Sequence, residues 1–560
     1  MDGKIMEELV KFILTHPSKQ ALAKKKLALC KKYKVKKIPT DFDILLNAPA
    51  ELLPKLAHFV SKPTRTISGV AVIAVMTKPI ACPHGKCIYC PGGPGSFFGD
   101  VPMSYTGKEP STMRAIRNMY DPYLIVFNRL EQYVALNQPA EKVEIIIQGG
   151  TFPAFPKKYQ EEVIISCFKA LNDFSRLFFK DGTLDLKKYK EFFELPGDIT
   201  DEERGKRVRA KTLKVKGDLS ATILEREQRK NEKTFARCVG LTIETKPDWG
   251  MLKEGNMLLR LGCTRIELGV QTVYEDVIKK LNRGHNVEDS KKSTQELKDL
   301  GFKINYHMMP GLPGTTPRKD LEGLLSLFTD EGFMPDMLKI YPCMVMPGTP
   351  LYEMWKKGRF VPLRTKQAAR LIAQFMGKVP EWVRIMRVQR DIPTTQTSDG
   401  VDRTNLRQYI DEEMKKRGLV CCDIRAREVG RYTGKIGKVG FKVSHYRASG
   451  GNEFFIQAAF KGYLLGYCRL RFPKENLRKE ITPSTGIIRE LHVFGQQVGI
   501  GKTGEVQHRG IGRKLLAIAE DLCRTYYKDK IVVISGVGVR EYYKKLGYRK
   551  EGVYMVRKIA

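Results

Sequence analysis

The sequence predicts an α/β protein: a partial or complete (β/α) barrel followed by a smaller mixed α/β domain. Between residues 68 and 345, six apolar strand-like runs alternate with helical stretches, as in a parallel sheet covered by helices. After residue 420, strands return around a glycine-containing turn and a long amphipathic helix. A chain of 560 residues is also too long for one hydrophobic core, so several domains are expected.

The charge of the chain favours a polyanionic partner. Lys and Arg total 98 against 62 for Asp and Glu, which gives a net charge of +36. Such a field attracts nucleic acid. The alternative is the lysine-rich surface of a heat-adapted protein, which would carry Glu to match. No apolar run is long enough to span a bilayer, and the N-terminus lacks a signal-peptide cleavage site. We therefore expect a cytoplasmic protein with no membrane association.

The first 75 residues are helical in pattern and basic. Eight lysines and no acid lie between Lys24 and Lys37. Such a run is either a solvated helix face or a grip for phosphates.

We expect the barrel over residues 76–345, with its chemistry at the carboxyl ends of the strands, where polar GGT, ETKP, GVQT and PGLPG segments fall. A charged insert over 172–236 ends in a segment that predicts a basic, exposed helix. Residues 346–420 are helical in pattern and broken by prolines, which indicates a linker region. The second domain is expected over 421–560.

Three cysteines follow the first predicted strand in the segment ACPHGKCIYCPGGPG: Cys82, Cys87 and Cys90. Soft thiolates bind iron–sulfur clusters, and close spacing in a Gly/Pro loop lets them converge on one object. A [4Fe–4S] cluster held by three thiolates keeps one iron open for another ligand. The alternatives are a zinc ion with His84 as fourth ligand, or unrelated buried thiols.

The spacing of this trio resembles the radical SAM signature, although the first gap holds four residues instead of the common three. Gly149, Gly150 and Thr151 resemble the family motif that contacts the amino group of S-adenosylmethionine (SAM). Glu244 and Gln271 end later strands, where family members line the SAM pocket, although strand-end polar residues also cap loops. The resemblance implies a [4Fe–4S] cluster, SAM, a 5′-deoxyadenosyl radical and an electron donor.

The second domain carries a motif for an anionic ligand. Its glycines let backbone N–H groups approach a phosphate at a helix N-terminus, although glycine pairs also open helices for packing reasons. The motif resembles the pyrophosphate loop of GNAT acetyltransferases, which bind acetyl-CoA. The loop residues are Gln507, His508, Arg509, Gly510, Ile511 and Gly512. The strand expected to face the CoA arm carries Glu490, Leu491, His492 and Val493.

Tyr542 and Tyr543 lie on a later predicted helix, about 100° apart around its axis, so they cannot both face one partner. We expect one to pack and the other to reach the cleft. A tyrosine at this place in GNAT enzymes protonates the departing thiolate, which makes both tyrosines candidates for a general acid.

Together the two signatures, with segments such as IIQGGTF, TIETKPDW and RVQRDIP, resemble the catalytic-subunit family of the Elongator complex over about residues 20–560. The resemblance implies a tRNA-modifying acyltransferase. A SAM-derived radical would activate the methyl group of acetyl-CoA, and 5-carboxymethyluridine would form at the wobble position. Specific RNA recognition targets unstacked bases such as those of an anticodon loop. Either a homodimer or Elongator-type subunits are compatible with the sequence.

Two rival functions remain at this point. A protein lysine acetyltransferase would keep the GNAT loop and use the iron–sulfur domain only structurally, whereas an RNA-binding scaffold would use neither motif. Cluster-dependent SAM cleavage separates both from the radical enzyme.

A structural zinc ion is a further hypothesis. Cys343, Cys421 and Cys422 are its thiolate candidates, with a histidine such as His307. Neighbouring strand residues face opposite ways, which counts against the pair at 421 and 422.

Overall fold

The computed structural model describes residues 3–35, 38–49, 52, 55–56, 59, 69–195, 201–432, 434–494 and 510–559. The chain forms two compact units. The first comprises Met1–Ile73, Asp121–Glu144 and Val163–Cys238. The second comprises Ala74–Tyr120, Ile145–Glu162 and Val239–Ala560, and it holds both predicted sites.

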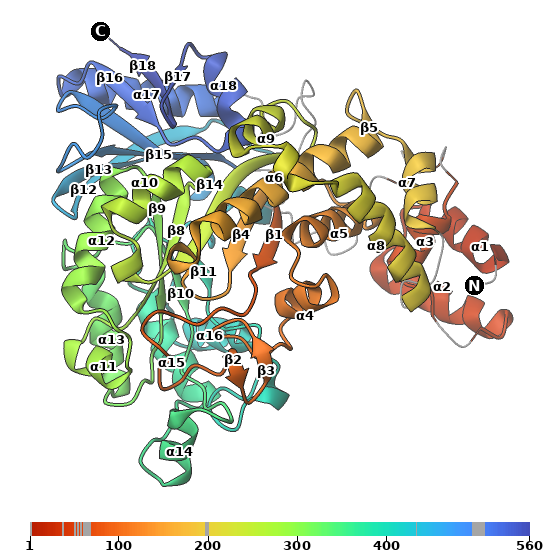
Figure 1. Cartoon of the computed structure of the whole chain (residues 1–560), viewed down its shortest axis with the longest axis horizontal. Helices are drawn as coiled ribbons and strands as arrows, with labels where there is room; N and C mark the ends of the chain where they lie inside the picture. Colours follow the sequence, from red (N-terminus) through yellow and green to blue (C-terminus); the bar gives the residue numbers. More distant parts are fainter. Residues whose placement is uncertain are drawn as a thin grey trace. The chain divides into compact units, whose positions relative to one another are not determined.

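A seven-stranded sheet in the order β1-β4-β7-β8-β9-β10-β11 organises the first part of the second unit (Figure 1). Its two edge strands, β1 and β11, do not pair, so the strands form a half-barrel with an open side. The prediction of a partial barrel is therefore confirmed. The strands are β1 (Ala71–Met76), β4 (Lys142–Gln148), β7 (Arg237–Thr245), β8 (Arg265–Gln271), β9 (Lys303–Met308), β10 (Met337–Ile340) and β11 (Arg384–Arg387).

Helices connect these strands, and local signals fix several of their first turns. Asn286 and Asp289 form a capping box at α12, and Thr316 caps α13 before a proline in its first turn. A short hairpin, β2 (Gly93–Ser96) and β3 (Gly99–Val101), follows the cysteine loop. The helices are α4 (Pro110–Arg117), α6 (Lys157–Phe178), α10 (Leu252–Leu261), α11 (Glu275–Lys280), α12 (Val287–Asp299), α13 (Pro317–Ser326), α14 (Pro350–Lys356), α15 (Thr365–Met376) and α16 (Leu406–Lys416).

Residues 346–420 are not a linker, contrary to the prediction. The segment contains α14, α15 and α16, and its strand β11 pairs in parallel with β10, with Met337 opposite Arg384 and Leu338 opposite Ile385. The sequence concealed this strand because β11 has only four residues, two of which are arginines. The half-barrel thus has one more strand than the six expected, and that strand forms an edge.

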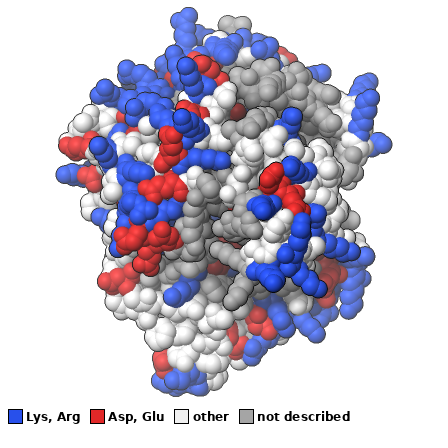
Figure 2. All heavy atoms as spheres, turned by 90° about the vertical axis from the view of Figure 1, so that its right-hand side faces the viewer, with Lys and Arg blue, Asp and Glu red and all other residues white. Residues whose placement is uncertain are grey.

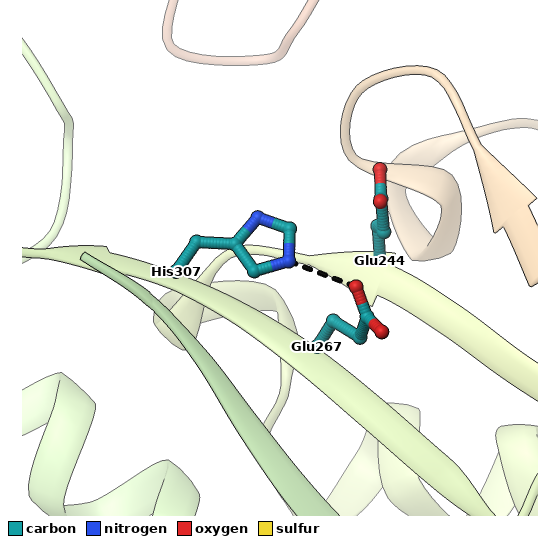
Figure 3. Close-up of side chains that lie close together, drawn as sticks. All are labelled: Glu244, Glu267 and His307. Carbon is teal, nitrogen blue, oxygen red and sulfur yellow. Dashed lines mark hydrogen bonds and ion pairs between the residues drawn. The ribbon is translucent and has the colours of Figure 1, made fainter. Parts of the chain in front are cut away.

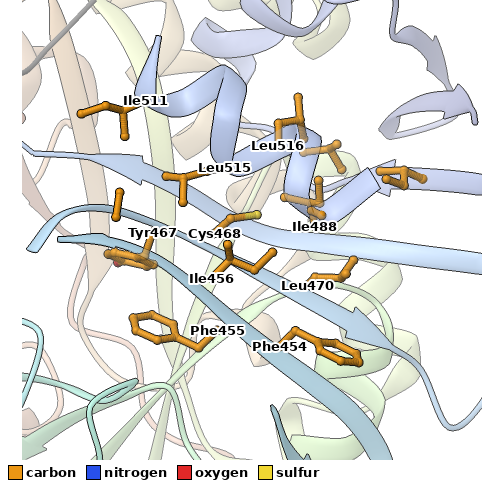
Figure 4. Close-up of a cluster of buried hydrophobic side chains, with 14 of the residues drawn as sticks. Phe454, Phe455, Ile456, Tyr467, Cys468, Leu470, Ile488, Ile511, Leu515 and Leu516 are labelled. Carbon is orange, nitrogen blue, oxygen red and sulfur yellow. The ribbon is translucent and has the colours of Figure 1, made fainter. Parts of the chain in front are cut away.

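The C-terminal domain is a mixed sheet in the order β12-β13-β14-β15-β16-β18-β17. Helix α17 (Ile511–Thr525) packs on it through Ile511, Leu515 and Leu516, which join an apolar core with Phe455 and Cys468 of the sheet (Figure 4). The mixed α/β prediction is confirmed. The remaining elements are β12 (Gly440–Ala448), β13 (Gly451–Phe460), β14 (Tyr463–Phe472), β15 (Thr485–Val493), β16 (Lys530–Val533), α18 (Arg540–Lys544), β17 (Arg549–Glu551) and β18 (Tyr554–Lys558).

The first unit is mainly helical, and the buried apolar side chains of its N-terminal helices form a core of their own, which includes Ile5, Leu9 and Ile44. Edge-on and tilted rings of Phe127, Phe174, Phe178 and Phe193 form a separate aromatic group in the same unit. The same compact unit also contains Asp121–Glu144 and Val163–Cys238, which include most of the charged insert. Its elements are α1 (Gly3–Ile13), α2 (Lys19–Lys32), α3 (Asp41–Asn47), α5 (Pro122–Ala135), β5 (Phe179–Lys180), β6 (Thr183–Leu184), α7 (Leu186–Phe193), α8 (Glu202–Lys216) and α9 (Leu224–Asn231).

The exposed basic helix expected near the end of the insert is only half right. Helix α9 forms there, but it buries Leu224, Glu227, Gln228 and Asn231. Asn231 donates to Asn172 at 2.9 Å, which ties the helix into the unit. The polar residues Glu227, Gln228 and Asn231 of α9 therefore pack inside the unit and do not face solvent. In the described part of the chain, no helix is both long and apolar enough to traverse a bilayer.

Candidate functional site

A cavity of about 1050 Å³, part of it open to solvent, lies at the carboxyl ends of the half-barrel strands. The C-terminal strand ends are where this kind of fold places its chemistry. Seven of the residues predicted from sequence line the cavity together: Cys82, Cys87, Cys90, Gly150, Thr151, Glu244 and Gln271.

The cysteine loop is built from tight turns that bring its thiols inward. The N–H of Gly85 donates to the carbonyl of Cys82 at 3.0 Å, and the N–H of Cys90 donates to that of Cys87 at 2.9 Å. Gly85 has φ +83°, a conformation that favours glycine. Cys87 and Cys90 are each 5% exposed, and Cys82 is half-buried. The loop therefore directs all three sulfur atoms to the cavity wall.

Each sulfur atom has a polar neighbour. The N–H of Ser104 donates to Cys90 Sγ at 3.3 Å, and Arg283 Nη1 donates to Cys87 Sγ at 3.4 Å. Cys82 Sγ lies 3.5 Å from Thr151 Oγ1. Burial raises the pKa of Cys82 and of Cys90, so thiolates here need compensation from donors, cations or bound iron.

His84 is oriented as a donor and not as a metal ligand. The ammonium group of Lys246 donates to His84 Nδ1 at 3.0 Å, which places the ring proton on Nε2. Nε2 lies 3.3 Å from Cys87 Sγ and therefore donates to it. Burial, Lys246 and Arg283 lower the pKa of His84 to about 4, so the ring is neutral.

The donor set fits an iron–sulfur cluster better than a zinc ion. In a tetrahedral zinc site with Zn–S near 2.3 Å, ligand sulfurs are about 3.8 Å apart. Among the described residues, the metal-binding group whose donor atoms all lie within 4.8 Å of one another is Glu244, Glu267 and His307, and it contains no cysteine. The three thiols line one cavity without lying as close together as zinc ligands do, which fits a group larger than a single ion, such as an iron–sulfur cluster.

Figure 3 shows the acidic group on the cavity floor, in which His307 points toward Glu267. A cation that the figure does not draw, Lys339, also belongs to this group. His307 Nε2 lies 2.8 Å from Glu267 Oε2, and Lys339 Nζ bonds Glu267 and lies 3.5 Å from Glu244. Burial opposes ionisation of Glu267, but Lys339 and His307 hold its pKa well below the ordinary value. The Lys339 ammonium group thus takes the place of a metal ion, and the floor is an ionic cluster that stays charged.

Gly149 and Gly150 have conformations that only glycine adopts readily, with φ +116° and +95°. A Cβ atom on Gly149 would lie 2.4 Å from Thr77 Oγ1, and one on Gly150 would lie 3.7 Å from Cys82 Sγ. The glycine pair therefore lets the end of β4 approach β1 and the cysteine loop closely. Gly149 itself supports this turn and does not line the cavity.

Substitution Gly149→Ala should lower the free energy of unfolding by about 2 kcal/mol or more, because backbone strain and the contact with Thr77 add. Urea denaturation monitored by tryptophan fluorescence measures this. The matched control is Gly358→Ala, which has φ +67° and no atom within 4 Å of the added Cβ, so it carries the backbone cost alone. Equal losses in the two variants would contradict the role of close packing.

Four residues of the site were not predicted from the sequence, namely Lys246, Glu267, Arg283 and Arg390, and His307 was predicted only as a possible zinc ligand. A signal existed for Glu267, because an acid in the middle of the buried strand β8 needs a partner. Its partners lie on β9 and β10, and only the strand order brings them together. Arg390 follows β11, which lies in the segment predicted to be a linker region.

The C-terminal domain offers a second candidate site where β15 leaves β16. These strands pair in parallel only from Thr485 to Ile488, whereas β14 pairs with β15 up to Val493. The predicted CoA-facing residues lie on this later part of β15. Glu490 also forms an ion pair with Arg469 at 3.0 Å, His492 stacks on Tyr467, and Leu491 packs against the domain core.

The start of α17 faces this part of β15. Gly510 caps the helix with φ +77°, and a Cβ atom on Gly512 would lie 3.6 Å from Val493. Ile511 points into the domain core. Gln507, His508 and Arg509 lie outside the described residues.

The two candidate tyrosines have different environments. Tyr543 is 5% exposed and packs against Tyr548 in the domain core. Tyr542 is half-buried, and its hydroxyl group lies 3.0 Å from the position of a Cβ atom on Gly512. Burial raises the pKa of Tyr542, partly offset by Arg513, so the hydroxyl group keeps its proton. Of the two tyrosines, Tyr542 is therefore the one that lies beside the start of α17.

The zinc hypothesis for Cys343, Cys421 and Cys422 is wrong. His307 bonds Glu267 in the cavity, and Cys421 donates to Asp423 at 3.3 Å. Cys343 is buried beside the cysteine loop, and Cys422 is exposed. These side chains do not form a metal-binding group within the described residues.

The lysine run on α2 is partly paired. Lys26 bonds Asp41 at 2.7 Å, Lys32 bonds Glu8 at 2.7 Å, and Lys25 lies 3.8 Å from Glu8. Lys36 and Lys37 lie outside the described residues. The run is therefore less strongly basic in the fold than in the sequence.

The half-barrel and its cysteine-lined cavity define the class of the protein as radical SAM. Residues 79–328 match the radical SAM superfamily, 335–416 match the Radical_SAM C-terminal domain, and 3–67 match the ELP3 N-terminal domain. This class implies a [4Fe–4S] cluster and SAM.

Relatives over the whole chain define the family. The chain is 43% identical to a tRNA uridine(34) acetyltransferase of Methanocaldococcus infernus, covering 93% of this chain and 92% of that one. It is 40% identical to Elongator complex protein 3 of Saccharomyces cerevisiae, covering 94% and 90%. The solved structure of the archaeal Methanocaldococcus infernus Elp3 lacking its N-terminus matches with TM-score 0.70 and 38% identity, over 88% of this chain and 100% of that one. The chain belongs to the family of Elongator complex protein 3 and the archaeal tRNA uridine(34) acetyltransferases.

Proposed function

We propose that this protein modifies uridine 34 of tRNA, with acetyl-CoA as the carbon donor and 5-carboxymethyluridine as the product. The observation that carries the proposal is the single cavity that gathers three cysteines, a glycine turn and a charged floor in a chain whose relatives are named for tRNA uridine(34). Those relatives are named acetyltransferases, so the carboxymethyl product is the finer part of the proposal.

Cys82, Cys87 and Cys90 would hold the cluster, and Gly150 and Thr151 would meet SAM. When bound, these groups supply a 5′-deoxyadenosyl radical that removes a hydrogen atom. The chain's own residues position the reactants and exclude water. Arg283 and His84 direct N–H groups at Cys87, while Lys339 keeps the floor carboxylates charged.

In the C-terminal domain, β15 and the start of α17 would bind acetyl-CoA. The exposed backbone edge created beyond Ile488 suits the extended CoA arm, and the helix N-terminus suits its pyrophosphate group. The methyl carbon of the acetyl group, after losing one hydrogen atom to the 5′-deoxyadenosyl radical, would become bonded to carbon 5 of uridine. The hydrogen of carbon 5 would leave as a proton while one electron returns to the electron carrier of the enzyme, and water would hydrolyse the thioester to release CoA. Two separate sites in one compact unit are consistent with this order.

A tRNA partner accords with the charge of the protein. On the molecular face drawn in Figure 2, basic side chains are spread widely and acidic ones form smaller groups. The excess of 98 basic over 62 acidic residues supports a phosphate-binding surface. We propose that the lysines of α2 and the basic side chains of the insert contact the phosphates of the tRNA backbone. An external electron donor is required, and either a homodimer or Elongator-type subunits would fit.

Mass spectrometry of nucleosides tests the proposal. The reconstituted enzyme is incubated anaerobically with tRNA, reductant, SAM and acetyl-CoA, and each cofactor is omitted in turn. We expect a 5-carboxymethyluridine peak that requires both SAM and acetyl-CoA. Acetylated protein lysines without a modified nucleoside would instead support a protein acetyltransferase.

Tyr542→Phe should lower the rate of product formation by about 10²-fold or more if the hydroxyl group acts as general acid toward the CoA thiolate. The fold should be retained, because only a half-buried hydroxyl group is lost. The control is Tyr543→Phe, the buried neighbour, which should stay near the wild-type rate. Single-turnover product formation measures both. Equal effects in the two variants would remove Tyr542 from the chemistry.

A further inference from the structure

One arginine beyond the edge strand β11 is hydrogen-bonded to the segment that follows the cysteine loop, and both residues of this bond line the cavity. Ser104 lies in the segment that follows β1 and the cysteine loop, and Arg390 lies three residues beyond β11. Arg390 Nη2 donates to the carbonyl oxygen of Ser104. This bond therefore links the segment that follows β11, an edge strand of the sheet, to the segment that follows the cysteine loop and the β2–β3 hairpin.

Arg390 is held in place but keeps an unsatisfied charge. Its guanidinium group stacks on the Tyr105 ring with 5.6 Å to the centroid. Gln389 anchors the backbone at this point by accepting the N–H of Leu406 at 3.0 Å. Within the described part of the chain, no carboxylate lies within 4.0 Å of the Arg390 guanidinium group. The group is half-buried and lines the cavity, so its positive charge faces the space where reactants bind.

A second arginine lies beside it. Arg387, the last residue of β11, also lines the cavity, and it forms an ion pair with Asp391. The Arg387 side chain is 49% exposed, so the pair can be exchanged for another oxyanion at small cost. Arginine is suited to bidentate contact with oxyanions because its N–H groups form a planar fork.

We propose that Arg390, assisted by Arg387, binds a phosphodiester of the RNA strand at the open side of the half-barrel. This inference rests on the proposed function. SAM is small enough to lie within the cavity, whereas a nucleotide in a strand must bring its flanking phosphates to the opening. The carboxylate of SAM has similar oxyanion chemistry, and the experiment distinguishes the two sources.

The test uses an anticodon stem-loop RNA that contains the target uridine, in two forms. One form has natural linkages, and the other has uncharged methylphosphonates on both sides of the target uridine. Fluorescence anisotropy gives the affinity for the reconstituted enzyme. We expect the wild type to bind the uncharged form about tenfold more weakly, and Arg390→Gln to bind both forms equally. The variant should also reduce the slope of log affinity against log salt by about one.

Controls separate this site from general electrostatics and from SAM. Arg407→Gln removes a surface arginine of α16 that pairs with Asp411, and it should still discriminate between the two RNAs. SAM affinity without RNA is measured by equilibrium dialysis and should be retained in Arg390→Gln. Loss of SAM affinity with retained RNA discrimination would overturn the proposal and assign Arg390 to the SAM carboxylate.

Failure of this inference can be distinguished from failure of the proposed function. If the wild type makes the nucleoside product but Arg390→Gln still discriminates tenfold, the phosphate site is wrong and the enzyme assignment stands. If the wild type neither binds the stem-loop nor yields product, the proposed function fails first. Arg390→Lys should restore part of the discrimination, because the charge returns without the planar fork.

Discussion

Replacing Cys87 by serine should abolish formation of the modified nucleoside while leaving the fold intact. Serine is a poor ligand for iron, so the cluster should be lost or depleted. The hydroxyl oxygen can still accept from Arg283 and His84, which lie 3.4 and 3.3 Å from Cys87 Sγ, so the free energy of unfolding should change by no more than about 1 kcal/mol. Iron content, visible absorbance, thermal unfolding and nucleoside mass spectrometry measure these effects.

The matched control for this variant is Cys343→Ser. Cys343 is fully buried in the same apolar group as Cys87 and Cys90, but it does not line the cavity. It should keep its iron and its product. Full product from Cys87→Ser would exclude the radical step. Loss of iron from both variants would show that iron is lost because a buried site is disturbed and not because a ligand to iron is removed.

Much of the fold could be predicted because apolar runs mark buried parallel strands. Strand β8 is buried at all positions but its last, and β4 carries a run of three isoleucines and buries every second residue, so both stand out in the sequence. Strand β11 is short and begins and ends with arginine, and β12 is an edge strand with most of its residues partly exposed. Such strands carry little hydrophobic signal, because pairing and not burial defines them.

The candidate site divides in the same way. The three cysteines lie close together in the sequence, and so do the two glycines. Such clusters are unusual unless they bind a ligand or form a special turn, so the sequence alone identifies them as candidate site residues. Lys339 and Arg390 become functional candidates only through neighbours that are distant in sequence, and His307 meets its partner Glu267 in the same way. A single lysine, histidine or arginine gives no such signal, because each is common at the protein surface.

A buried ionic network joins the half-barrel to the C-terminal domain. Asp336, which directly precedes β10, accepts from Arg489 of β15 at 2.8 Å and lies 3.6 Å from Arg469. Glu453 of β13 bonds Arg489 and also lies 3.7 Å from Lys298 of α12. All five side chains are 1% exposed or less. Burial opposes ionisation, but Arg489 and Lys298 hold the pKa of Asp336 well below its ordinary value.

Asp336→Asn should therefore be strongly destabilising. The amide keeps the shape and can still accept the N–H of Ile304, now at 2.8 Å, but it leaves buried cations without their counter-charge. Breaking a buried ion pair in this way costs about 3–5 kcal/mol. Differential scanning calorimetry should show a lower transition temperature, and the second unit should separate into two transitions. Asp521→Asn, which breaks an exposed pair with Arg524, is the control and should have little effect.

A second substitution shows whether the loss comes from unpaired charge. Arg489→Met in the Asp336→Asn background removes the cation that the first change left unpaired, so part of the lost stability should return. Failure of the double variant to recover would mean that steric fit and not charge holds the domains. The network reaches both candidate sites, because Asp336 leads into the strand of Lys339 and Arg489 precedes Glu490 on β15. Asp336→Asn should consequently slow product formation even under conditions in which each domain remains folded.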